Sequence, residues 1–132
     1  MISIKEINYD HLKVYIEGLE RYNTPANVIE IDRIHKNFDA SAHDSFIFLH
    51  FEGKIEELKK EVEHISLSCV KNDFLIVISG NHEISLYEIS EMVDIAKKCL
   101  PFKKVSTYVE WIYNEKLEGL NADVVVTKKG KL

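Results

Sequence analysis

The sequence predicts an α+β fold, a two-layer sandwich in which a four-stranded mixed β-sheet carries two long helices on one face. Short apolar runs in the middle of the chain are typical of buried strands, and two longer stretches place apolar residues every three or four positions, as amphipathic helices do. The C-terminal part alternates polar and apolar residues like a pair of strands. Packing both helices on one face of the sheet is the simplest way to bury all of these residues.

A helix is predicted first, over residues 8–22. Its apolar residues recur along one face: Leu12, Ile16 and Leu19. Pro25 prevents the helix from continuing, because proline lacks a backbone N–H and biases the residue before it toward extended geometry. A short strand over residues 28–31 and a polar stretch as far as Asp44, either helical or irregular, complete this leading region, residues 1–45.

The remainder of the chain, residues 46–132, is predicted to run β-α-β-α-β-β. These elements are expected at residues 46–51, 55–65, 74–79, 85–100, 103–113 and 122–127. The first and third are apolar on both faces, as central strands are, and the second and fourth each carry one apolar stripe. No linker or repeat interrupts the sequence, so residues 1–132 are predicted to form a single domain.

The junction between the third and fourth of these elements carries the clearest local signal. Gly80 follows a buried apolar run, and a short polar loop leads from it to Ser85. Ser85 and Glu88 have the spacing of a capping box, in which each side chain accepts a hydrogen bond from the other residue's backbone N–H. A helix is therefore predicted to begin at Ser85.

Composition narrows the classes of function. The 132 residues are 45% hydrophobic and 30% charged, which is ordinary for a soluble domain, and the net charge of -5 without a basic stripe argues against binding to nucleic acid. No apolar run approaches a membrane span, and the first residues lack the pattern of a secretion signal, so a cytoplasmic protein with no membrane partner is expected. Cys69 and Cys99 are expected to be reduced, largely buried thiols.

Few residue patterns indicate a catalytic or metal-binding site. His43, Asp44 and His50 are close in the sequence, and His50 and Glu52 would share one face of a strand. No compact pair of histidines on a helix accompanies them, so no metal and no cofactor are expected. His82 lies next to a predicted helix N-terminus, where it would either assist an anion or stay solvated.

Two large aromatic residues of the strand predicted at residues 103–113 are expected to point in opposite directions. Tyr108 and Trp111 are three positions apart, and successive side chains of a strand alternate between its faces. One of them is therefore expected in the core. The other, if exposed, is a candidate contact for a partner protein.

Three segments and their order resemble the C-terminal domain of the FtsZ/tubulin family. Val77-Ile-Ser-Gly80 resembles the end of a family strand usually written Ile-Thr-Gly, and Ile84-Ser-Leu-Tyr-Glu-Ile89 resembles the start of the following helix. Ala122-Asp-Val-Val-Val-Thr127 resembles the last strand of the closing hairpin. The resemblance implies the same α+β fold.

The family's catalytic loop has the pattern Asn-x-Asp-x-x-Asp and acts on nucleotide held by the next subunit. Glu30 stands here in place of the asparagine, Asp32 keeps the first aspartate, and His35 replaces the second, while Asn37 begins another Asn-x-Asp. A histidine does not supply the anion that such a loop needs. The five glycines are dispersed, so no phosphate-binding loop is expected either. The chain is therefore expected not to be an enzyme.

The resemblance implies a stand-alone, non-catalytic domain that acts in cell division through protein–protein contact. It would bind or cap an FtsZ-type polymer, or pair with a separate FtsZ/tubulin-like GTPase half. The residues implied in this contact form a degenerate interaction loop: Glu30, Asp32, His35 and Asn37.

Two alternatives stay open. One is an oligomeric small-molecule-binding or regulatory domain of the chorismate-mutase-like type, with ligand sites between the subunits of a homo-oligomer. A basic cluster in a pocket would favour it, but the lysines considered for that role are dispersed: Lys71, Lys97, Lys98, Lys103 and Lys104. The other alternative is one domain of a longer protein, or a remnant without activity.

Overall fold

The structure, a computed structural model, describes residues 1–25, 27–38, 40–82 and 84–129. Its elements are β1 (Ile2–Asn8), α1 (Tyr9–Gly18), the 3₁₀ helix η1 (Leu19–Tyr22), α2 (Ile31–Asn37), β2 (Ser45–Glu52), α3 (Ile55–Val62), β3 (Val70–Gly80), α4 (Leu86–Lys97), β4 (Ser106–Tyr113) and β5 (Leu120–Lys128). The predicted first helix and the predicted β-α-β-α-β-β succession are both confirmed. Their ends differ from the predicted ones by a few residues.

Within the described residues the sheet has five strands in the order β1-β2-β5-β3-β4. β3 and β4 are parallel, and the other neighbours are antiparallel, so the sheet is mixed as predicted. The prediction of four strands is wrong because it omits β1. This strand lies at an edge and buries only Ile7, so its sequence lacks the apolar content by which the other strands were recognised.

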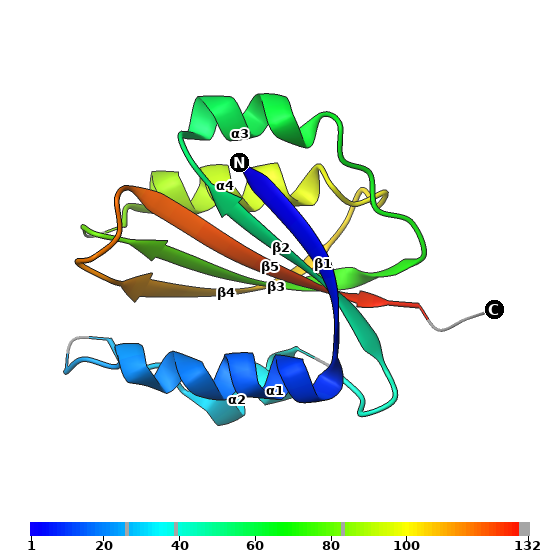
Figure 1. Cartoon of the computed structure of the whole chain (residues 1–132), viewed down its shortest axis with the longest axis horizontal. Helices are drawn as coiled ribbons and strands as arrows, with labels where there is room; N and C mark the ends of the chain where they lie inside the picture. The colour runs from blue at the N-terminus through cyan, green and yellow to red at the C-terminus, as the bar shows by residue number, and fades with distance from the viewer. Residues whose placement is uncertain (26, 39, 83, 130–132) are drawn as a thin grey trace.

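Helices cover both faces of the sheet (Figure 1). The two long helices α3 and α4 lie together on one face, as predicted, whereas α1 and α2 lie on the other. The predicted two-layer sandwich is therefore wrong, and the molecule has three layers. The second helical layer exists because α1 and α2 carry apolar faces of their own, which need a surface to cover.

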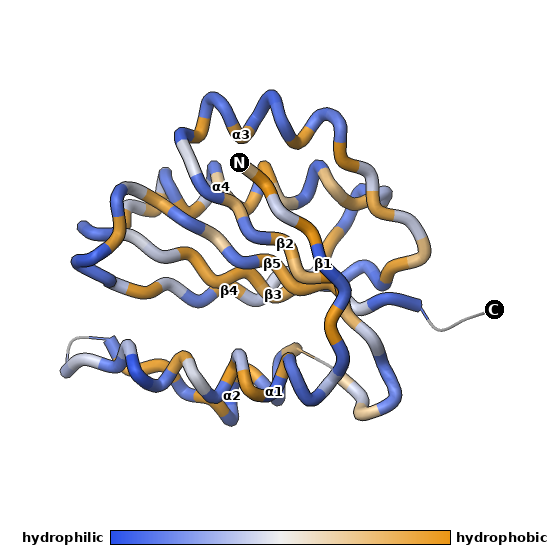
Figure 2. Tube along the Cα trace, viewed as in Figure 1, coloured by the Kyte–Doolittle hydropathy of each residue, from blue (hydrophilic) through white to orange (hydrophobic). Residues whose placement is uncertain are grey.

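Two apolar cores result, one on each side of the sheet. The larger contains the buried side chains of α3 and α4, such as Leu58, Val62, Met92 and Ile95. The smaller contains those of α1 and α2, such as Leu12, Ile16 and Ile34. Strands β2, β3 and β5 contribute to both cores, which explains why they are apolar on both faces and mostly hydrophobic in Figure 2.

The predicted short strand at residues 28–31 is not formed. The segment begins as a loop in which the backbone N–H of Ile29 donates to Oδ1 of Asn23 at 2.6 Å, and α2 starts at Ile31. Ile34 and Phe38 are buried at helical spacing from Ile31. The helical periodicity of the apolar residues therefore outweighs the strand preference of the β-branched ones.

Local signals elsewhere have the expected outcome, with one exception. Ser85 caps α4, and both hydrogen bonds of the predicted capping box with Glu88 are present. Both cysteines are free thiols and Cys99 is buried, but Cys69 is exposed, contrary to the prediction of two largely buried thiols. Its φ of 55° places it in a tight connection before β3, where its side chain has no core to enter.

Among the described residues, no helix combines the length and apolarity needed to cross a bilayer.

Candidate functional site

The predicted interaction loop is largely a helix. Glu30 is the N-cap of α2 without a side-chain capping bond, and Asp32 is exposed in its first turn. His35 lies one turn further on and is half-buried, so these two residues share one side of the helix. Asn37 ends the helix, and its Nδ2 donates to the carbonyl of Arg33 at 2.8 Å. Asp32 and His35 are thus brought together, while Asn37 is directed back onto the helix itself.

Helix α2 lies beside the edge strand β4. Tyr108 of β4 donates a hydrogen bond to Glu110 at 2.7 Å. Burial, followed by this bond, raises the pKa of Tyr108 to about 12, and the charges of Arg33 and Glu30 also act on its hydroxyl. The start of α2 is therefore close enough to β4 for their charges to interact.

The loop before α2 also contacts the open edge of β4. Nδ2 of Asn27 donates to the backbone carbonyl of Trp111 at 2.9 Å, which satisfies one acceptor that an edge strand leaves unpaired. Trp111 is 37% exposed and Tyr113 45% exposed, whereas Tyr108 packs into the smaller core. The predicted opposite orientation of Tyr108 and Trp111 is confirmed, and Trp111 is the exposed one.

We call this region the β4 edge surface and define it by Asn27, Glu30, Asp32, Trp111 and Tyr113. The exposed side chains of Trp111 and Tyr113 leave β4 on the face opposite to Tyr108, and the exposed carboxylates at the start of α2 lie on the Tyr108 side of the same edge. Large aromatic residues dominate the energetics of protein interfaces, and flanking charges set partner choice.

A second feature is a polar network between α1 and the sheet. His50 of β2 and Asp123 of β5 are directly opposite in the sheet, and Nδ1 of His50 is 2.6 Å from Oδ1 of Asp123. The hydroxyl of Tyr15 donates to Oδ2 of the same carboxylate at 2.8 Å. Burial, reinforced by Asp123, raises the pKa of Tyr15 well above its ordinary value. This network holds α1 on the sheet.

The two histidines and two carboxylates considered for a metal site do not all come together in the structure. His50 and Glu52 do share a strand face, as predicted, with Nε2 and Oε2 at 3.5 Å. His43 and Asp44 precede the opposite end of β2, and Asp44 lies 3.9 Å from the ammonium of Lys71. No cluster of three or more His, Cys, Asp or Glu side chains suited to a metal occurs in the part of the chain described.

His82 lies at the N-terminus of α4, where the sequence left two roles open. Its Nε2 is 3.1 Å from Oε2 of Glu88, and its Nδ1 is 2.9 Å from Oδ1 of Asn81. The pKa of Glu88 is lowered mainly by the hydrogen bond that its carboxylate accepts from the backbone N–H of Ser85, and further by its hydrogen bond with His82. A carboxylate of the chain itself therefore occupies the position in which an anion was considered.

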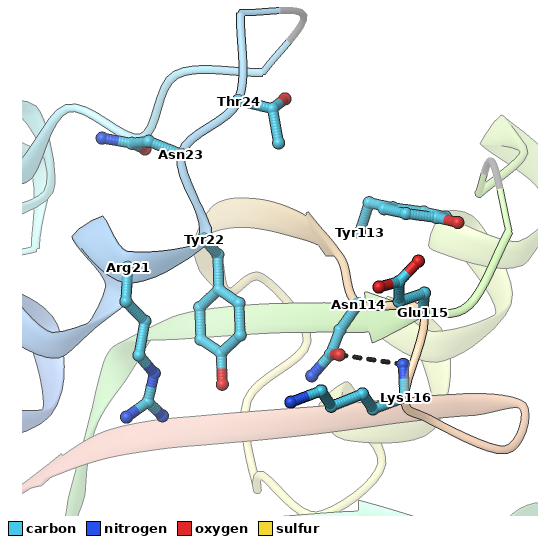
Figure 3. A pocket seen from close by; sticks show the side chains of 8 residues that line it. All are labelled: Arg21, Tyr22, Asn23, Thr24, Tyr113, Asn114, Glu115 and Lys116. Atoms are coloured by element: carbon cyan, nitrogen blue, oxygen red, sulfur yellow. Dashed lines mark hydrogen bonds between the residues drawn. The ribbon is translucent and has the colours of Figure 1, made fainter.

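The third feature is an open hollow of about 560 Å³ between η1 and the end of β4 (Figure 3). One wall comes from residues 21–24 and the other from residues 113–116. The guanidinium of Arg21 lies over the ring of Tyr22, 4.8 Å from its centroid. Sequence reasoning missed this site, because its two walls are about ninety positions apart and only the tertiary fold joins them.

Comparison with known proteins adds no relative. Neither a model of a known protein family nor a curated protein matches this sequence.

Proposed function

We propose that this protein is a non-catalytic binding domain that docks onto a partner protein through the β4 edge surface. The observation that carries the proposal is the exposure of Trp111 at the open edge of the sheet, where Asn27 from the loop before α2 donates to its backbone carbonyl. An exposed aromatic on an edge strand offers both a side-chain anchor and backbone groups to a partner.

The partner that we propose is a filament-forming GTPase of the FtsZ/tubulin type, which would give the protein a role in cell division. The support is the resemblance of the three segments to the family's C-terminal domain, together with a mixed sheet and α3 and α4 on one of its faces. Asp32, which belongs to the β4 edge surface, and His35, one turn further along α2, stand in the position of the family's catalytic loop. Docking there would cap a filament end or complete a separate GTPase half.

Sedimentation of a purified FtsZ-type GTPase with and without this protein tests the proposal. We expect less polymer in the pellet and a lower rate of GTP hydrolysis at stoichiometric amounts of the protein. Trp111→Ala and Asp32→Lys should each restore both quantities toward the values without the protein. Polymer mass and hydrolysis that stay unchanged with wild-type protein would remove the proposal.

Matched variants exclude effects of general surface change. Tyr87→Ala removes an aromatic side chain that is 70% exposed on α4, and Glu63→Lys reverses an exposed charge after α3. Both should act on the filament like the wild type. Thermal melting of all four variants shows whether each is folded, so a loss of activity in a folded Trp111→Ala protein is attributable to the surface.

A second candidate function has its own observation. The cationic side chains of Arg21 and Lys116 line the hollow between η1 and β4. A basic pocket is the feature that favours the small-molecule-binding alternative. In that reading the protein is a ligand-binding domain, and the lysines considered from the sequence do not line this hollow.

A further inference from the structure

We infer that the hollow between η1 and the end of β4 binds an oxyanion carried on an aromatic ring. The inference does not depend on docking to a filament. Its elements are two cationic side chains, an amide and two tyrosine rings that line one open cavity: Arg21, Lys116, Asn114, Tyr22 and Tyr113.

The donors converge on one region. In Figure 3 the side chains of Arg21 and Tyr22 reach down from η1, and that of Lys116 reaches toward them from the opposite wall. Oδ1 of Asn114 accepts a hydrogen bond from the backbone N–H of Lys116 at 3.1 Å. This bond orients the amide, so that its Nδ2 faces the same region (Figure 3).

The cations of the hollow are only partly balanced by a carboxylate of the hollow itself. Among the residues that the structure describes, neither Arg21 nor Lys116 forms an ion pair, whereas Lys59 and Lys128 are paired with carboxylates. Glu115 also lines the hollow, with its carboxylate beside Tyr113 in Figure 3, and it forms no ion pair with either cation. With two cations and one carboxylate lining it, the hollow keeps a net positive charge in a chain of net charge -5.

The shape of the donors selects the class of ligand. A guanidinium presents a planar fork that matches the oxygens of phosphate and carboxylate, and the ammonium of Lys116 adds a second positive charge. Arg21 is held against the ring of Tyr22, with 4.8 Å from Cζ to the centroid, so less of its side-chain freedom remains to be lost on binding. Tyr22 and Tyr113 supply flat apolar walls for a ring attached to the oxyanion.

An NMR titration of the full chain with phenyl phosphate tests the inference. We expect saturable shifts of backbone amides at residues 21–24 and 113–116, and not at the separate hollow lined by residues 71–73. Inorganic phosphate and benzyl alcohol, which carry only the charge or only the ring, should each bind at least about tenfold more weakly. Benzoate distinguishes the source of the oxyanion, since tighter binding than phenyl phosphate indicates a carboxylate ligand.

Variants then assign the binding to the proposed side chains. Arg21→Gln and Lys116→Gln should each weaken phenyl phosphate about tenfold, because a hydrogen bond between charged groups is lost. Arg21→Lys keeps the charge but not the fork, and should lose less. Lys104→Gln, which removes an exposed cation beyond the other end of β4, should bind like the wild type.

The inference is overturned if neither phenyl phosphate nor benzoate gives saturable shifts at the hollow. It is also overturned if folded Arg21→Gln and Lys116→Gln proteins bind as tightly as the wild type, or if Lys104→Gln weakens binding as much as they do. Thermal melting of each variant establishes that it is folded. Because the titration contains no partner protein, its failure leaves the filament experiment unaffected.

Discussion

His50 and Asp123 lie opposite each other on adjacent strands, with Nδ1 of the imidazole 2.6 Å from Oδ1 of the carboxylate. The second oxygen of Asp123 accepts the hydroxyl of Tyr15 at 2.8 Å. One carboxylate thus serves two donors, one from the sheet and one from α1. The two interactions use different oxygens of Asp123, so each can be tested separately.

Removing the hydroxyl of Tyr15 should destabilise the protein. Tyr15→Phe loses a hydrogen bond to a carboxylate, which typically contributes about 1.5 kcal/mol or more to the free energy of unfolding. Asp123→Ala should cost more, about 3 kcal/mol, because it leaves both donors without their acceptor. Urea unfolding measures both values. Tyr9→Phe is the matched control on the same helix, and equal costs for Tyr15→Phe and Tyr9→Phe would contradict the role of the network.

Stability should fall at alkaline pH, in part because of Cys99. Burial raises the pKa of its thiol from 9.0 to about 11. Between pH 9 and 11 the unfolded state releases the thiol proton, whereas the folded state keeps it. The stability that Cys99 contributes is therefore complete below pH 9 and is lost as the pH rises toward 11. Each pH unit in that window should remove about 1.4 kcal/mol.

Urea unfolding at pH 8, 9 and 10 checks this expectation. Cys99→Ala lowers stability at every pH by removing core volume, but its stability should decline less steeply between pH 9 and 10. Cys69→Ala, at the exposed cysteine, should keep the wild-type slope. Parallel slopes for wild type and Cys99→Ala would show that the thiol does not cause the decline.

Removing the cap of α4 should weaken that helix. Ser85→Ala loses the hydrogen bond from the backbone N–H of Glu88 at 3.1 Å, at a cost of about 1 kcal/mol in a thermal or urea melt.

Because the pKa of Glu88 is lowered in the folded state, the stability that its carboxylate supplies is present above pH 4.5 and is lost as the pH falls below that value. Glu88→Gln should remove this acid-dependent part. Ser90→Ala, an exposed serine of the same helix, should not lower stability at pH 7.

Two glycines should respond to alanine in opposite directions. A Cβ at Gly80 would lie 3.0 Å from Cδ2 of Leu120 and 3.3 Å from Cγ1 of Ile84, so Gly80→Ala should destabilise the protein by about 1–3 kcal/mol. Gly18 has helical backbone angles and no atom within 4 Å of its would-be Cβ. Gly18→Ala should therefore stabilise by about 0.5–1 kcal/mol, and chemical denaturation of both proteins shows whether the signs differ.

Elements with a strong apolar periodicity could be predicted from the sequence. Helices α3 and α4 are predictable from their apolar stripes, and strands β2 and β3 from apolar runs that cover both faces. Each pattern reflects burial of the element's own residues, so it is visible in the local sequence. β1 cannot be found this way, since most of its side chains face solvent. Its backbone pairing with β2 places it in the sheet, and that pairing leaves no apolar pattern in the sequence. The predicted strand at 28–31 is wrong because four residues are too few to separate strand from helix periodicity.

The candidate sites show the same division. The shared strand face of His50 and Glu52 and the opposite faces of Tyr108 and Trp111 follow from alternation along one strand, so both were predictable. The partnership of His50 with Asp123 depends on which strands become neighbours. A charged residue within an apolar strand such as β5 is the signal that could have pointed to a buried partner.

The position of β5 has a consequence for synthesis of the protein in the cell. Of the strands described, it is the last to leave the ribosome, yet it fills the middle of the sheet between β2 and β3. A nascent chain that lacks it has two separate strand pairs whose inner edges are bare templates for association with other chains. Formation of the complete sheet must therefore wait until residue 128 has been synthesised.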